Sequence, residues 1–160
     1  MREIVPVSSC FGCGICERSC LNNAISMNYD NEGFLRYSID ENKCIDCSFC
    51  NKVCGSYNSN CLKNPIGQAF GAYITDDEIR NVSSSGGVFT AFARSIIQND
   101  GVVFGAASVN NYIRHIKAEN EEELVSIRGS KYVQSDIRPI IEDLFNAIDN
   151  GRFVLFVGTP

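Results

Sequence analysis

The sequence predicts an α+β protein built from two unlike parts. Eight of the nine cysteines fall before residue 55, whereas the rest of the chain alternates apolar segments of helical and strand period. The 160 residues suffice for one ordinary domain, or for a small domain joined to part of another. We therefore expect a small Cys-rich domain at residues 1–62, a linker at 63–68 and an α/β domain at 69–160.

The composition is that of a globular protein without membrane spans or nucleic-acid affinity. Hydrophobic residues make up 44% of the chain and charged residues 21%. The net charge of −5 comes without a basic patch, which argues against nucleic-acid binding. The longest apolar runs, such as residues 153–157, are too short to cross a bilayer, and the N-terminus lacks an apolar targeting segment. We expect a cytoplasmic location.

Two cysteine runs of identical spacing dominate the first part. Each run reads Cys-x2-Cys-x2-Cys-x3-Cys, which is the spacing of bacterial iron–sulfur proteins. Because no secretory signal is seen and the cytosol is reducing, metal binding is favoured over disulfides. In such runs the fourth cysteine binds the other cluster, so the expected ligand sets cross. One set is Cys10, Cys13, Cys16 and Cys54, and the other is Cys44, Cys47, Cys50 and Cys20.

The duplication predicts a domain of two similar halves. Gly12 and Gly14 help the first cysteine loop to turn, and Asp46 and Ser48 occupy the matching positions in the second loop. Between the two runs, residues 28–33 read as the turn of a β-hairpin.

Zinc is the main alternative metal. Structural zinc sites use cysteine pairs that are well separated, which two complete four-cysteine runs do not resemble. No ligand is missing from either run, so we expect two 4Fe-4S clusters rather than 3Fe-4S. The ninth cysteine, Cys61, lies outside both runs and is expected to be a spare thiol rather than a ligand.

The second part alternates predicted strands and helices. Residues 70–74 read as a strand, followed by a helix over 88–98 that serines 83–85 could cap. Strands are predicted at 102–107 and 112–118, a short helix at 121–127, a helix after Asp136 with Pro139 in its first turn, and a buried strand at 153–157. Since a buried strand is normally followed by further structure, we expect the chain to be part of a longer protein. His115, the single histidine, is expected to be structural rather than a proton donor.

Residues 5–57 resemble the two-cluster bacterial ferredoxins. The proline that commonly follows the fourth cysteine in that family is replaced here by Leu21 and Gly55. Three later stretches, at 84–91, 129–135 and 154–160, together resemble the beta subunits of the coenzyme F420 hydrogenase/dehydrogenase family. On its own, the first of these stretches fits either an anion-binding helix start or an ordinary helix cap.

The family resemblance implies a fold and a function. The fold is a two-cluster ferredoxin-like domain followed by the N-terminal part of an α/β flavin-binding domain, here incomplete. The function is that of an iron–sulfur flavoprotein oxidoreductase, in which FAD passes electrons between the 4Fe-4S clusters and F420 or another small organic donor or acceptor. The resemblance also implies a redox partner protein or subunit. The implied flavin-binding residues are Ser85, Gly86, Gly87, Lys131, Tyr132, Gln134, Ser135, Gly158 and Thr159.

Two other functional classes remain open from the sequence. The chain could be a ferredoxin-like electron carrier without a catalytic site of its own, in which the second part serves only for docking. Alternatively, the clusters could be structural or could sense oxygen. Flavin content distinguishes the first alternative, and a reversible low-potential reduction excludes the second.

Overall fold

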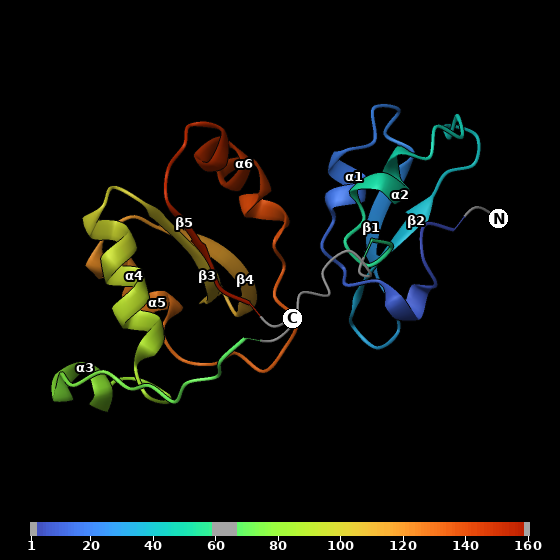
Figure 1. The fold of residues 1–160 in the computed structure, drawn as a ribbon. Coiled ribbons are helices and arrows are strands. Elements are labelled where there is room, and N and C mark those ends of the chain that lie inside the picture. Colours follow the sequence, from blue (N-terminus) through green and yellow to red (C-terminus); the bar gives the residue numbers. More distant parts are fainter. Residues whose placement is uncertain (1–2, 59–66, 159–160) are drawn as a thin grey trace. The chain divides into compact units, whose positions relative to one another are not determined.

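The computed structural model describes residues 3–58 and 67–158 of the chain. The chain divides into two compact units, Met1–Gly67 and Gln68–Pro160 (Figure 1). The first unit holds the two cysteine runs, and the second holds the helices and strands of the α/β part.

The first unit is built on one β-hairpin and a pair of short helices. Strands β1 (Ile25–Tyr29) and β2 (Leu35–Ile39) pair antiparallel, with Ile25 opposite Ile39 (Figure 1). The predicted hairpin turn is confirmed, because the Asp30 carboxylate accepts hydrogen bonds from two backbone N–H groups of the turn. The short elements are η1 (Val7–Ser9), α1 (Ile15–Arg18) and α2 (Phe49–Val53).

Side chains from the hairpin and from α2 secure the N-terminal segment of this unit. The Tyr37 hydroxyl accepts a hydrogen bond from Ile4 N–H (3.0 Å) and donates one to the Val5 carbonyl (2.5 Å). The Asn51 amide donates to the Ile4 carbonyl at 3.0 Å. The unit therefore has a small core, whose buried apolar residues are Ile4, Val5, Ala24, Ile25, Met27 and Leu35.

The second unit is a three-stranded sheet with helices on both faces. The strands β3 (Val102–Val109), β4 (Tyr112–Ala118) and β5 (Val154–Phe156) lie in the order β4-β3-β5. β3 pairs antiparallel with β4 and parallel with β5, so the sheet is mixed. The helices are α3 (Asp77–Asn81), α4 (Val88–Gln98), α5 (Glu121–Ile127) and α6 (Ile141–Asp149), the last preceded by η3 (Arg138–Ile140).

Alternate residues of the central strand β3 feed two separate cores. Helices α4 and α5 cover one face of the sheet and α6 covers the other, as Figure 1 shows. Val103 belongs to the first core, while Val102 and Phe104 belong to the second, as the two-residue period of a strand requires. The mixed α+β class predicted from the sequence is thus observed.

Two local predictions for the segment before α4 were wrong. Residues 70–74 form no strand, because no neighbouring strand pairs with them and only Ile74 N–H bonds across, to the Gly86 carbonyl at 2.7 Å. The serines do not cap α4, whose N-cap is Gly87 in the left-handed conformation (φ 76°). The hydroxyl of Ser83 instead donates to the Ile79 carbonyl of α3, a helix that the sequence reading missed.

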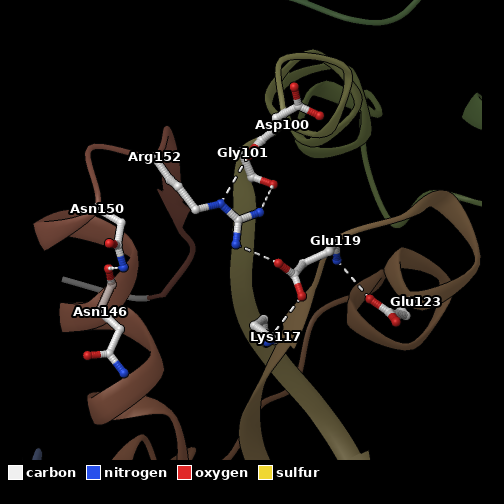
Figure 2. Close-up of polar contacts among 8 residues, drawn as sticks. All are labelled: Asp100, Gly101, Lys117, Glu119, Glu123, Asn146, Asn150 and Arg152. Carbon is white, nitrogen blue, oxygen red and sulfur yellow. Dashed lines mark hydrogen bonds and ion pairs between the residues drawn. The ribbon is translucent and has the colours of Figure 1, made fainter.

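Arg152 joins three elements of the second unit at one end of the sheet (Figure 2). Its guanidinium donates to the carbonyls of Asp100 and Gly101, each at 3.1 Å, and to the Glu119 carboxylate at 2.6 Å. The hydrogen bond from Arg152, together with that from Lys117, lowers the pKa of Glu119. This contact fixes the entry to β5 against the start of β3 and the end of β4.

Candidate metal centres

Two hollows in the first unit are each lined by four cysteines. The larger, of about 360 Å³, is lined by Cys20, Cys44, Cys47 and Cys50. The smaller, of about 230 Å³, is lined by Cys10, Cys13, Cys16 and Cys54. Each hollow therefore combines three cysteines of one run with the fourth of the other, in the same crossed grouping that the spacing predicts.

The two cysteine loops share one backbone conformation. Gly12 and Gly14 have φ values of 68° and 73°, and the matching Asp46 and Ser48 have 63° and 56°. In each loop the second of these residues is the N-cap of a short helix, α1 or α2. The helix then carries the chain onward by about one turn, so that the fourth cysteine turns toward the other hollow.

The electrostatics of these hollows favour a cationic group. Burial, together with the neighbouring thiol of Cys13, raises the pKa of Cys16 to about 12. Burial also raises the pKa of Cys13, and the nearby thiols of Cys54 and Cys10 act in the same direction. Burial raises the pKa of Cys50 as well. Four thiolates can share such a space only if positive charge lies between them, which is what iron supplies.

The donor set fits an iron–sulfur cluster better than a single ion. Within residues 3–58 and 67–158, no three His, Cys, Asp or Glu side chains are placed to hold one metal ion. Four thiols that surround a hollow instead suit a multi-iron cluster. Backbone N–H groups already point at two of the sulfurs, from Gly12 to Cys10 (3.4 Å) and from Ala24 to Cys20 (3.3 Å). Hydrogen bonds of this kind tune the potential of such clusters.

Comparison with known proteins supports this interpretation of both units. Residues 9–57 match the model of the 4Fe-4S dicluster domain, and residues 69–142 match that of coenzyme F420 hydrogenase/dehydrogenase, beta subunit N-term. The chain carries both domains. Together they indicate an electron-transfer role in an oxidoreductase, as the sequence resemblance implied. A search of curated proteins found no match. In the described part of the chain, no helix is both long and apolar enough to span a membrane.

The glycines at the start of α4 in the beta-subunit domain are required by packing. A Cβ on Gly86 would lie 2.8 Å from the Ala72 carbonyl oxygen, and one on Gly87 would lie 2.5 Å from Cγ2 of Ile74. The space beside both glycines is therefore filled by residues 72–74 of the same chain. Ser85 next to them is exposed.

Lys131 closes the end of helix α5. Its ammonium group donates to the carbonyls of Ser126, Ile127 and Arg128 at 3.2, 2.9 and 2.7 Å. Burial lowers the pKa of this lysine. A cation at this position compensates the negative end of the helix dipole. Its neighbour Tyr132 is 92% exposed.

His115 joins two of the three stretches that resemble the beta-subunit family. This buried side chain bonds the Ser135 hydroxyl through Nδ1 (2.8 Å) and the Val157 carbonyl through Nε2 (2.9 Å). It also stacks on the Phe156 ring, with centroids 4.9 Å apart. A Cβ on Gly158 would lie 3.8 Å from Nε2. Ser135 and Val157 thus meet at one histidine, from which they lie 20 and 42 residues away, and nothing in the sequence indicates this link.

Three predicted residues remain. Gln134, which precedes Ser135 in the sequence, is half-buried. Thr159 and the spare thiol Cys61 lie outside the described residues.

The pKa of His115 should lie below the usual value of about 6.5 in the folded protein. Burial lowers this pKa, although the Val157 hydrogen bond acts in the opposite direction. Since a carbonyl only accepts, Nε2 carries the proton and Nδ1 accepts from Ser135 in the neutral ring. As the pH falls, the histidine takes up its proton more readily in the unfolded chain than in the folded protein. The contribution of the neutral, buried His115 to the free energy of unfolding is therefore complete above about pH 6.5 and declines below it.

An NMR titration of the single histidine tests this expectation, because only one imidazole signal is present. We expect a midpoint below that of the urea-unfolded chain. Ser135→Ala is the matched control, which removes one partner and leaves the ring buried. A midpoint at or above the unfolded value in the wild type would contradict the buried, neutral histidine.

Proposed function

We propose that this chain is the electron-transferring part of an iron–sulfur flavoprotein oxidoreductase. It would pass electrons between two 4Fe-4S clusters and FAD, with F420 or another small organic carrier as donor or acceptor. The observation that carries the proposal is the presence of two four-cysteine hollows in a chain that also contains the beta-subunit domain. The proposed cluster ligands are the two crossed sets, Cys10, Cys13, Cys16 and Cys54, and Cys20, Cys44, Cys47 and Cys50.

A flavin takes up a hydride as a pair of electrons and clusters accept electrons singly, so the two together convert one mode of transfer into the other. The protein contributes the thiolates and the N–H groups that face them. In the second domain, the proposed flavin contacts are Ser85, Tyr132, Gln134, Gly158 and Thr159. Gly86, Gly87, Lys131 and Ser135 already have internal roles, which for Ser135 is the hydrogen bond to His115.

The net charge of the chain bears on the kind of partner that it would meet. The chain carries a net charge of −5, and bound clusters with thiolate ligands make it more negative. We propose that it exchanges electrons with a redox protein or subunit that presents a basic face, in the cytoplasm.

A ferredoxin-like carrier without its own catalytic site is the second candidate. The internal packing roles of Gly86, Gly87 and Lys131 favour it, because these residues no longer require a flavin to explain them.

The deciding experiment is the amount of iron and flavin per chain, measured by acid extraction after purification without oxygen. About eight irons and one flavin per chain are expected for the oxidoreductase. Eight irons without flavin would favour the carrier. Iron well below eight per chain, after anaerobic reconstitution with iron and sulfide, would overturn both.

A further inference from the structure

The two cysteine loops differ in exposure at some of their matching positions. Phe11 of the first loop and Ile45 of the second are both exposed. Gly12 and Gly14 are buried, however, and no cysteine that lines the first hollow is exposed. In the second loop Cys47 is exposed, and so are the apolar residues around it. We call the exposed residues 45–49 of the second loop, together with Leu21, the second cluster face; all of them line this hollow.

This face combines exposed apolar side chains with an acidic residue, Asp46. Leu21 is 95% exposed and Ile45 is 68% exposed, and both line the same hollow. The charged residues that line the hollow are Glu3 and Asp46, both acidic. The other hollow has no charged residue in its lining.

The second loop also keeps side chains where the first loop has none. Asp46 and Ser48 adopt the left-handed conformation that Gly12 and Gly14 adopt without a Cβ. This conformation is uncommon for residues that carry a Cβ, although aspartate adopts it more readily than most. The first loop demonstrates that the cysteine geometry is reached with glycine alone, so ligand geometry does not account for these two side chains. Strain of this kind is typically retained at functional sites.

We propose that the second cluster face is the docking surface for a basic one-electron redox protein. The centre held by Cys20, Cys44, Cys47 and Cys50 would then exchange electrons with that partner. A single electron passes between the partner's redox centre and this cluster, one being oxidised as the other is reduced, and no bond forms or breaks. This inference rests on the proposed function to the extent that the hollow must hold a cluster.

The chemistry of the face suits a transient partner. Electron-transfer encounters bury less than about 1,200 Å² in total, so a few exposed apolar residues beside an acidic one can make up much of such a contact. Complementary charge mainly increases the rate of association, and this effect falls as salt rises.

The test compares two charge-removing variants of the full chain, Asp46→Asn and Glu32→Gln. Glu32 lies in the turn of the β-hairpin. At the other end of the hairpin, the pair Ile25 and Ile39 lines the hollow of the second cluster face. The next pair toward the turn on the same side, Met27 and Tyr37, lines the other hollow. Both variants therefore change the net charge equally, but only the first changes the face.

The probe is cytochrome c, a basic haem protein, at low ionic strength. Affinity is measured with both proteins oxidised, so that no turnover occurs, and electron transfer is measured after reduction of the chain. We expect Asp46→Asn to weaken binding and slow transfer about fivefold, with the difference vanishing in high salt. Glu32→Gln should change neither by more than about 1.5-fold.

Asp46→Gly separates docking from folding. It should weaken binding like Asp46→Asn, while iron stays at about eight per chain and the unfolding midpoint rises because the strain is relieved. Equal weakening of binding by Asp46→Asn and Glu32→Gln would mean that only the net charge matters. No weakening by Asp46→Asn would mean that the partner binds elsewhere, or that the chain's own second unit covers the face. Either result overturns the inference, whereas loss of iron in the wild type would overturn the proposed function instead.

Discussion

Replacing Cys13 with Ala will lower the iron content from about eight to about four atoms per chain. Cys13 lines the smaller hollow with Cys10, Cys16 and Cys54, so its loss removes one of the four thiols of that centre alone. The larger hollow is lined by none of these residues and keeps its full set. Iron and acid-labile sulfide, determined after anaerobic purification, measure the effect.

Double variants test the crossed sets more strictly. Cys13→Ala combined with Cys54→Ala should lose no more iron than either single variant, because both residues line one hollow although they belong to different runs. Cys13→Ala combined with Cys20→Ala should lose nearly all the iron, although these two cysteines belong to the same run. The reverse pattern would show that each run binds its own cluster.

Gly101→Ala should be the most destabilising small substitution in the second unit, with a cost of about 2–3 kcal/mol. A Cβ at this position would lie 2.7 Å from the carbonyl oxygens of both Ile96 and Phe153. Neither carbonyl can turn away, because Ile96 accepts from Gly101 N–H at the end of α4 and Phe153 accepts from Val102 N–H at the start of β3. The Gly101 carbonyl also receives the Arg152 hydrogen bond.

Urea unfolding followed by far-UV circular dichroism measures this cost, with the clusters kept intact under anaerobic conditions. Gly71→Ala is the matched control, since Gly71 is exposed and its Cβ would meet no atom within 4 Å. We expect that control to change stability by less than about 0.5 kcal/mol. Equal stability of the two variants would refute the packing described around Gly101.

The sequence predicted those features that depend on spacing or on period. Identical cysteine runs gave the crossed grouping of thiols, because the fourth cysteine of each run comes one helical turn beyond the third. The apolar period located α4, α5, α6 and the three strands of the second unit, because each element buries one stripe or face.

Features that depend on tertiary contact could not be predicted in this way. Residues 70–74 have the composition of a strand, but a strand exists only where another strand pairs with it. Gly86 and Gly87 resemble an anion-binding loop in sequence, yet the close approach of Ala72 and Ile74 explains both glycines. The link from His115 to Ser135 and Val157 joins three separate segments, which no local pattern reveals.

The most direct test of electron transfer is a reductive titration without oxygen, in which electrons taken up per chain are counted while electron paramagnetic resonance follows the clusters. We predict reversible uptake of one electron by each of two 4Fe-4S clusters, in protein that contains about eight irons. Any bound flavin would add its own two electrons, which its absorbance separates from those of the clusters. Clusters that take up no electrons reversibly, or zinc in place of iron, would contradict the account.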